Sequence, residues 1–226
     1  MPPPDVVLSA MATRHCKRAF LDRAVPRALL AEVLLAAGQA PSTRNTQLWQ
    51  ATAVSGGALE ALVAALCAAF DGGEPPHLEY PGRPPDLGAD VERRARDAGS
   101  GVLRARGAAV SDATARRALL RDNLHFYGAP VALVCHLPGT AVAGTFLEMG
   151  FFLQNVMLGL VAHGLGSCPQ ASVAGYADIL RKELAIGTDR LIVCTLAVGY
   201  PDEAAPVNRF VPQRAGLEEF TQWHGW

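Results

Sequence analysis

The chain has 226 residues, half of them hydrophobic, and its 20 Lys and Arg residues nearly balance its 21 Asp and Glu residues. This length and apolar content fit one large domain or two small ones with a sizeable buried core. A net charge of −1 argues against the broad basic surface that non-specific binding of nucleic acid or of an acidic membrane requires.

The N-terminus and the cysteines indicate the compartment. The opening MPPPDVVLSA has no basic region and no long apolar stretch, so a signal peptide is not expected there. The cysteines are odd in number and show neither a CxxC pair nor a zinc spacing: Cys16, Cys67, Cys135, Cys168 and Cys194. Most lie in apolar segments, which favours reduced core thiols in a cytoplasmic protein without a metal site.

The first local feature is the basic stretch MATRHCKRAF at residues 11–20. If a helix begins at Ser9 or continues through Thr13, Arg14 and Arg18 are four residues apart and share one face. Two guanidinium groups on one face make a site for a phosphate. An ordinary solvated basic turn is the alternative, and this stretch alone leaves it open.

The next elements alternate between helix and strand. Pro26 and the apolar spacing after it predict a helix that ends near Gly38. The segment APSTRNTQLWQ, residues 40–50, is typical of a turn, and residues 49–54 predict a short strand. Residues 58–70 predict a second helix. Residues 71–89 contain five prolines and several glycines and predict an irregular insertion, functional or mobile.

The second half of the chain predicts further helices and the central strands. Residues 90–122 are charged with a helical pattern, 142–164 predict a long apolar helix, and 176–184 a short one. The runs PVALVCHL (130–137) and RLIVCTLAVGYP (190–201) predict strands, while LGSCPQAS predicts a loop between them. The fold class is therefore α+β.

Two segments need a partner surface. The apolar run at 146–165 contains Glu148, Gln154, Asn155 and His163, which are costly in lipid, so a buried core or interface helix is expected. Residues 201–226 have little periodicity and predict a C-terminal arm that packs on something else, such as a partner subunit.

The sequence does not support several common kinds of binding or catalytic motif. GLGSCP at 164–169 follows a helix and has Pro169 where a dinucleotide loop needs its third glycine. Neither a phosphate-binding P-loop nor a G-x-S-x-G motif is present. A nucleophilic Cys16 beside His15 is conceivable, but neighbours on a helix point apart. His125 and His163 are expected to be hydrogen-bonded core residues.

A planar cofactor with a phosphate fits the remaining polar residues better. The turn at Pro41 and Ser42 offers backbone amides, and the amides of Asn45 and Gln47 can bind the edge of a heterocycle. Arg209 and Arg214, after the last predicted strand, add positive charge for a phosphate.

Four segments together resemble the FMN-dependent nitroreductase family over most of the chain. TRHCKRAF is similar to the family's first motif, and APSTRNTQLW to its Ala-Pro-Ser-x-x-Asn-x-Gln-Pro-Trp motif. GFFLQNVMLGLVAHGLGSCPQ resembles its dimer-interface helix, and RFVPQRAGLEEFTQW its terminal segment. The chain departs from the family at Cys16, where Ser is usual, and at Leu48, where Pro is usual.

The resemblance implies one domain over residues 1–226, an α+β sandwich with a mostly antiparallel sheet, closed as a homodimer with two FMN molecules at its interface. Residues near the phosphate, ribityl chain and pyrimidine edge would be Arg14, His15, Cys16 and Arg18. The partner chain would supply Pro41, Ser42, Asn45 and Gln47. Ring-side contacts would come from Pro169, Gln170 and Ala171, with an amide near the flavin N5. Arg214 would return to the phosphate, with Arg209 as a further neighbour, and Asn123 would be a ring contact.

The implied activity is ping-pong hydride transfer from NADH or NADPH through the flavin N5 to an electron-poor small molecule, such as a nitroaromatic or a quinone. The cofactor carries this reaction, so no catalytic side chain is assigned. Three alternatives stay open. They are a specialised flavin reaction such as dehydrogenation or reductive dehalogenation, a non-catalytic flavin-binding protein, and an unrelated phosphate-binding regulatory domain.

Overall fold

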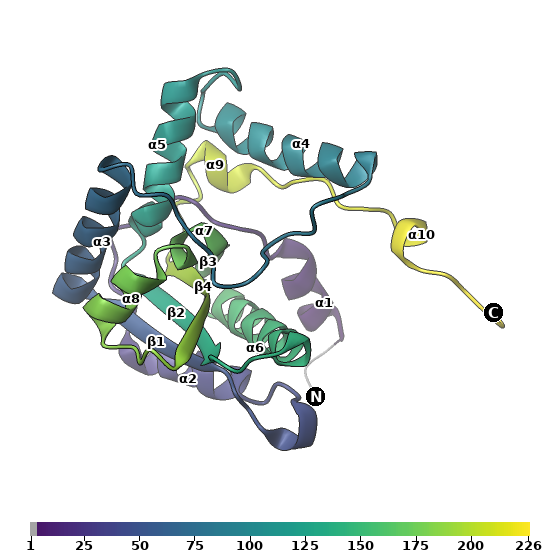
Figure 1. Ribbon diagram of the computed structural model, residues 1–226. Coiled ribbons are helices and arrows are strands. Elements are labelled where there is room, and N and C mark those ends of the chain that lie inside the picture. The colour runs from purple at the N-terminus through teal and green to yellow at the C-terminus, as the bar shows by residue number, and fades with distance from the viewer. Residues whose placement is uncertain (1–3) are drawn as a thin grey trace.

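An antiparallel sheet of four strands, in the order β1-β2-β4-β3, forms the middle layer of the fold (Figure 1). The computed structural model describes residues 4–226, so the first residues of the predicted single domain and of the MPPPDVVLSA segment lie outside the described part. The strands are β1 (Gln50–Ser55), β2 (Val131–Pro138), β3 (Gly166–Gln170) and β4 (Arg190–Gly199). The predicted α+β class is confirmed.

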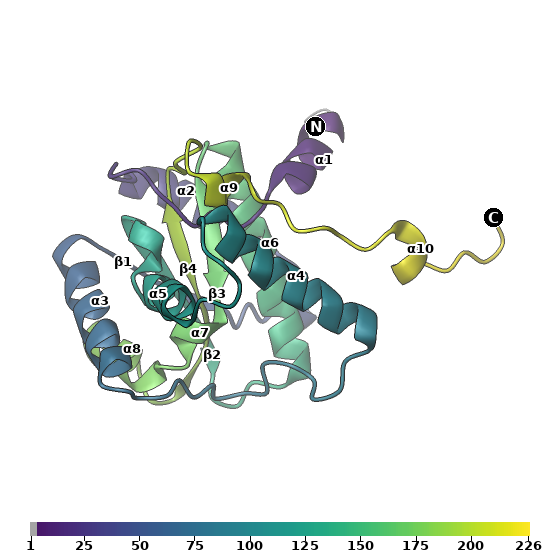
Figure 2. The same cartoon turned by 90° about the horizontal axis from the view of Figure 1, so that it is seen from above.

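Helices cover both faces of this sheet (Figure 2). The long helices of the two faces and of the rim are α1 (Pro4–Thr13), α2 (Arg27–Ala37), α3 (Gly56–Asp71), α4 (Ala89–Ala105), α5 (Ala113–Leu124), α6 (Ala143–Ala162) and α8 (Ala177–Leu184). Short turns of helix are η1 (Thr43–Asn45), η2 (Phe126–Gly128), α7 (Ala171–Ala174), α9 (Pro206–Arg209) and α10 (Leu217–Phe220). The helices predicted at 26–38, 58–70, 142–164 and 176–184 are confirmed to within two residues.

Alternation along β2 divides the core into two layers. Leu133 and Cys135 face α2 and α6, whereas Ala132 and Val134 face α3, α7 and α8. Successive side chains of a strand point to opposite faces, so a continuous apolar run such as 131–137 must be covered on both sides. The central strands β2 and β4 are accordingly buried along almost their whole length.

Helix α6 is the one described helix whose length and composition would let it cross a membrane. Its residues Met149, Phe152, Val156 and Leu160 are buried in the layer between the sheet and α2. Glu148 is also buried and accepts a hydrogen bond of 2.7 Å from the backbone N–H of Thr43. The helix therefore occupies the core position predicted for it.

The loop predicted for LGSCPQAS, residues 165–172, is wrong, because residues 166–170 form the edge strand β3. Its sequence, GSCPQ, is poor in strand-forming residues, and its strand conformation comes from pairing with β4. Pro169 is tolerated because an edge strand can direct a residue without an N–H away from the ladder. Similarly, the charged region 90–122 forms two helices, interrupted before Asp112, which caps α5 by accepting from the Ala115 N–H at 3.0 Å.

Residues 72–88 contain no helix or strand, but their backbone and side chains are attached to the sheet. The Tyr80 hydroxyl donates to the Val193 carbonyl at 2.5 Å, and a Glu79 carboxylate oxygen accepts from the Ile192 N–H at 3.0 Å. Both contacts fall where β2 and β4 shift register, between Cys135 and His136. The segment therefore occupies backbone groups of β4 that the irregular pairing leaves available.

After β4 the chain crosses α4 and leaves the body of the molecule as an arm (Figures 1 and 2). Gly101 of α4 leaves room for the ring of Phe210, which a Cβ there would strike. Arg94 and Glu219 form an ion pair of 2.7 Å that holds α10 against α4. Phe220, Trp223 and Trp226 are exposed at the end of this arm.

Candidate functional site

The basic stretch at residues 14–18 is extended, which corrects the helix expected there. Helix α1 ends at Thr13, and Cys16 forms an isolated parallel bridge with Ser167 of β3. The Lys17 N–H donates to the Ser167 carbonyl at 3.1 Å. In an extended chain alternate residues share a side, so Arg14, Cys16 and Arg18 still lie together although the helical reason for it was wrong.

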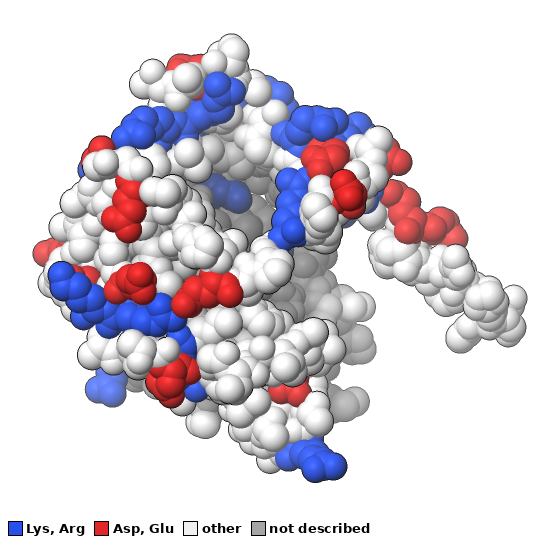
Figure 3. Space-filling model, in the orientation of Figure 1, with Lys and Arg blue, Asp and Glu red and all other residues white. Residues whose placement is uncertain are grey.

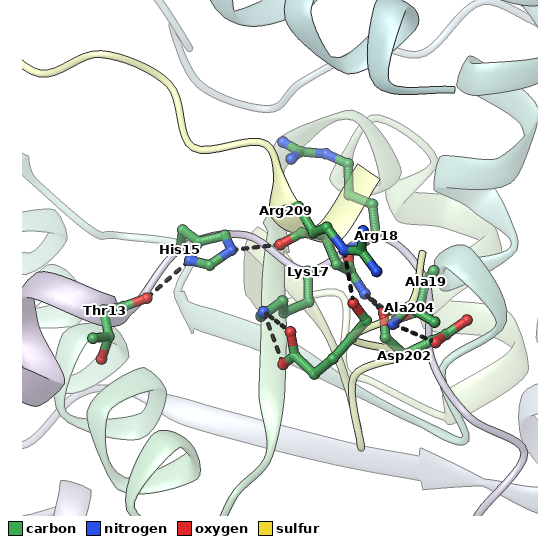
Figure 4. A network of polar contacts seen from close by, with 10 residues as sticks. Thr13, His15, Lys17, Arg18, Ala19, Asp202, Ala204 and Arg209 are labelled. Atoms are coloured by element: carbon green, nitrogen blue, oxygen red, sulfur yellow. Dashed lines mark hydrogen bonds and ion pairs between the residues drawn. The ribbon is translucent and has the colours of Figure 1, made fainter. Parts of the chain in front are cut away.

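The opposite side of the stretch is anchored by polar contacts (Figure 4). Each ring nitrogen of His15 lies 2.8 Å from a carbonyl oxygen, one of Thr13 and one of Asn208. The Lys17 ammonium group is paired with the Glu203 carboxylate at 3.0 Å.

Asn208 joins this stretch to the end of the chain. Its side chain accepts from the Arg18 N–H at 2.6 Å and donates to the carbonyls of Ala19 and Asp202 at 2.7 and 2.9 Å. The residue is 1% exposed. It also places Arg209 beside the stretch, where the Arg209 Nε donates to the Glu203 carbonyl at 3.2 Å. Sequence reasoning missed Asn208, because a lone Asn beside an arginine carries no recognisable signal.

The guanidinium groups of Arg14 and Arg18 are half-buried, and neither forms an ion pair with a carboxylate among the side chains that the structure describes. The ionisable groups that act on the Arg18 guanidinium are instead Cys168, Cys16 and Tyr127. Burial alone would lower the pKa of Arg18, but the neighbouring thiols and the phenol raise it. Burial raises the pKa of Tyr127 to about 12, so this neighbour stays neutral.

A buried amide network brings Asn123 to the predicted segment 169–171. The Gln170 side-chain amide donates to the Asn123 carbonyl at 2.5 Å and to the Asn123 side-chain oxygen, and Asn123 donates to Ser172 Oγ at 2.6 Å. Gln170 is 3% exposed, whereas Pro169 and Ala171 are exposed. The Gln170 side chain is thus used internally, and the segment offers its backbone and two small exposed residues to a ligand.

The predicted residues at 41–47 form a separate, exposed turn near the end of α2. Gln47 donates through its N–H to Ser42 Oγ at 3.1 Å and through its side chain to Asn45 Oδ1 at 2.9 Å. Arg44, Asn45 and Gln47 have positive φ values of 52°, 60° and 49°. Backbone strain of this kind persists where surrounding contacts hold it, often at ligand sites. Within the described part of one protomer, this turn forms no hydrogen bond or ion pair with the side chain of Arg14 or Arg18.

A hollow opens beneath α4 and α5, with Lys and Arg atoms at its rim and inside it (Figure 3). A pocket of about 280 Å³ also borders the basic stretch, lined in part by Arg14, His15 and Ser167. A larger pocket of about 760 Å³ lies between α3 and α5 and includes none of the predicted site residues. The candidate site is therefore located by the cations Arg14 and Arg18 and not by the size of a cavity. Arg214 lies apart from them, exposed on the arm.

Comparison with known proteins finds a family match and full-length relatives. The model of the nitroreductase family matches residues 11–200. The chain is 35% identical over 225 residues to nitroreductase NfnB of Mycolicibacterium smegmatis, covering 97% of this chain and 95% of that protein. It is 32% identical to the chloronitrobenzene nitroreductase of Comamonas testosteroni, covering 98% of each.

Solved structures are similar over the same extent. The crystal structure of the FMN- and NADPH-dependent nitroreductase NfnB from Sphigopyxis sp. strain HMH superposes with a TM-score of 0.94 at 40% identity, covering 97% of this chain and 99% of that one. The FMN-dependent NfnB of Mycobacterium smegmatis in complex with NADPH gives 0.92 at 33% identity, covering 97% and 98%.

Proposed function

Because the chain belongs to the nitroreductase family, we propose that it is an FMN-dependent oxidoreductase that takes hydride from NAD(P)H and reduces nitroaromatic compounds. NADPH is the favoured donor. One similar structure, 40% identical in sequence, is of an NADPH-dependent enzyme, and another, 33% identical, is of an enzyme in complex with NADPH. Nitroaromatic acceptors follow from the relatives, which include chloronitrobenzene and nitrobenzene nitroreductases.

The observation that carries this proposal concerns the guanidinium groups of Arg14 and Arg18. Among the described residues, neither of them forms an ion pair with a carboxylate. A half-buried cation without a carboxylate is costly, and a phosphate dianion would supply the missing charge. Arg14 and Arg18 lie on one side of an extended stretch, where both can bind one phosphate with charge-assisted hydrogen bonds. The donor set therefore fits the phosphate end of FMN, with His15 held against Asn208 to orient the stretch.

The ring end of FMN fits the end of β3 and the residue that follows it. When bound, FMN supplies the hydride chemistry between donor and acceptor. Exposed Pro169 and Ala171 offer a small apolar surface beside a planar ring, and the backbone of Gln170 offers the polar contact. The Asn123–Gln170 network holds this backbone in place, which keeps the ring in one position relative to the phosphate site.

A homodimer completes the site in this proposal. Among the described residues, the turn at 41–47 and the arm carrying Arg214 form no hydrogen bond or ion pair with the side chains of Arg14 and Arg18, so we assign them to the partner's flavin site. Apolar residues left exposed on α1, α6 and the arm would provide the interface: Val6, Leu8, Met11, Leu147, Phe151, Phe220, Trp223 and Trp226. Large exposed apolar surfaces of this kind mark protein interfaces. The homodimer would function in the cytoplasm.

The test is a spectroscopic titration of the purified protein. We expect a yellow protein whose flavin absorption bleaches on anaerobic addition of NADPH and returns on addition of nitrobenzene, with one reduced product formed per cycle. A yellow protein that millimolar NADPH and NADH fail to bleach would indicate flavin binding without catalysis. A colourless protein that does not take up FMN would contradict the proposal. Bleaching without reoxidation by nitroaromatics or quinones would point to a specialised acceptor.

A further inference from the structure

Four of the five cysteines, which share no sequence motif, are brought into two pairs by the fold. Cys16 lies on the basic stretch, its backbone bridged to Ser167 directly before Cys168, and both cysteines pack in the same apolar layer of the core. Cys135 and Cys194 are register partners on β2 and β4, on the other face of the sheet. All five cysteines are free thiols, and Cys67 belongs to neither pair.

The surroundings of the two pairs differ sharply. Cys16 is half-buried, lies between Arg14 and Arg18 on the extended stretch, and borders the candidate site. Its neighbour Cys168 is 2% exposed and lies in β3, one residue before the exposed Pro169. Cys135 and Cys194 are 1% and 8% exposed within the apolar layer under α6.

We propose that Cys16 and Cys168 are a peroxide-sensitive dithiol site, in which Cys16 is oxidised first and Cys168 then closes a disulfide between the basic stretch and β3. This oxidation depends on the juxtaposition of the two thiols and on the two flanking guanidinium groups, which favour a thiolate at Cys16. It requires neither bound FMN nor turnover.

The ionisation of the thiols supports this order of events. A hydrogen bond with the Cys168 thiol and the charges of Arg18 and Arg14 lower the pKa of Cys16 to about 5, although burial opposes them. The pKa of Cys168 is raised by its hydrogen bond with Cys16 and by burial, so it remains the protonated partner. In the other pair, the hydrogen bond with Cys194 and burial raise the pKa of Cys135, which leaves it unreactive.

The chemistry balances with hydrogen peroxide as the oxidant. The Cys16 thiolate attacks one peroxide oxygen, so that an S–O bond forms, the O–O bond breaks and hydroxide leaves. The Cys168 sulfur then attacks the Cys16 sulfenic acid, the S–S bond forms and water leaves with the Cys168 proton. Two thiols and one peroxide give one disulfide and two waters, with two electrons passing from sulfur to oxygen.

The experiment treats the purified protein, in its native cofactor state, with stoichiometric hydrogen peroxide at neutral pH. Remaining thiols are alkylated in denaturant, and digestion with trypsin and Glu-C separates Cys135 from Cys168 at Glu148. We expect a peptide pair that links Cys16 to Cys168, lighter by about two hydrogen masses and released by dithiothreitol. Cys67, Cys135 and Cys194 should be recovered alkylated.

Variants make each step separately testable. In Cys168→Ser the oxidation should stop at a Cys16 sulfenic acid that dimedone traps, and in Cys16→Ser the Cys168 thiol should stay reduced. Cys135→Ser is the matched control and should form the same Cys16–Cys168 link as the original chain. Cys16 and Cys168 recovered fully alkylated, or a Cys135–Cys194 link formed first, would overturn the proposal. Because the readout is thiol mass, its failure is distinct from a failure to bleach with NADPH.

Discussion

At the scale of single residues, Asn208 has the most consequences. Its buried side chain makes three hydrogen bonds, to Arg18, Ala19 and Asp202. Its backbone carbonyl oxygen contacts the His15 ring. Each partner is a backbone group. The carbonyls of Ala19 and Asp202 also accept backbone N–H groups, whereas the Arg18 N–H would lose its acceptor, which costs about 1–3 kcal/mol for a buried donor. The residue therefore serves both the stability of the fold and the position of the cations.

Asn208→Ala should lower the free energy of unfolding by about 1–3 kcal/mol, because it leaves the Arg18 N–H without its acceptor, while the carbonyls of Ala19 and Asp202 each keep a backbone donor. Chemical denaturation followed by circular dichroism measures this. The control Gln39→Ala removes an exposed amide and should stay within about 0.5 kcal/mol of the original chain. A loss of under about 1 kcal/mol at Asn208 would mean that water replaces its contacts.

The arginines assigned to the phosphate give a second prediction at this scale. Arg14→Ala combined with Arg214→Ala should weaken FMN binding by about 100- to 10,000-fold, since each charge-assisted contact contributes about 1.5–3 kcal/mol. Flavin fluorescence after gel filtration measures retention. Arg27→Ala, an exposed residue at the start of α2, is the control and should retain flavin. A double variant that stays yellow would contradict the phosphate assignment.

At the scale of elements, periodicity was sufficient for helices and strands that bury an apolar face. The strands β2 and β4 and the helices α2, α3, α6 and α8 were predicted because their residue patterns match helix or strand geometry. Strand β3 was missed because its conformation depends on pairing with β4 and not on its own residues. The extended stretch at 14–18 was missed for the same reason, since its bridge to Ser167 is a tertiary contact.

The irregular pairing of β2 with β4 contains a buried histidine whose protonation should limit stability in acid. His136 is 5% exposed, and its Nδ1 accepts from the Arg190 Nε at 3.0 Å, which leaves Nε2–H to donate to Thr52 Oγ1 at 3.2 Å. Burial and the Arg190 charge lower the pKa of His136 to about 4. The unfolded chain binds this proton near the ordinary value of 6.5, so the folded state loses stability as the pH falls between those values.

We expect the free energy of unfolding to decrease between pH 6.5 and pH 4, with His136 contributing at most about 1.4 kcal/mol per pH unit. In His136→Gln, which cannot titrate, the decrease should be shallower over this window, whatever its stability at neutral pH. His125→Gln removes an exposed histidine and should keep the original slope. Urea titrations at a series of pH values measure both slopes, and equal slopes for His136→Gln and the original chain would contradict the prediction.

At the scale of the whole molecule, the candidate site is divided between parts of the chain far apart in sequence and, in our proposal, between two protomers. The motifs allowed the residue types to be predicted, and the fold brings the basic stretch beside β3 and Asn123 against Gln170. Their mutual contacts could not be predicted, because the Asn123–Gln170 and Arg18–Asn208 hydrogen bonds span 47 and 190 positions. The dimer-dependent half of the site is still a prediction.

Leu147→Glu tests that dependence. Leu147 is 61% exposed on α6, so a carboxylate there should leave the protomer folded but disrupt an apolar interface. We expect a monomer by light scattering that has also lost most of its FMN. Leu35→Glu, on the exposed face of α2, should remain dimeric and yellow. A monomeric Leu147→Glu protein with a full complement of flavin would separate cofactor binding from assembly.

The hydrogen bond between the Arg18 backbone and the Asn208 side chain has a consequence for biosynthesis. While the ribosome is still translating, the segment containing Arg18 has left the exit tunnel long before residue 208 is made. Domains begin to fold during synthesis, but this clamp cannot close on a nascent chain that lacks Asn208. Flavin loading should therefore follow translation, and until then the basic N-terminal stretch would be available to chaperones.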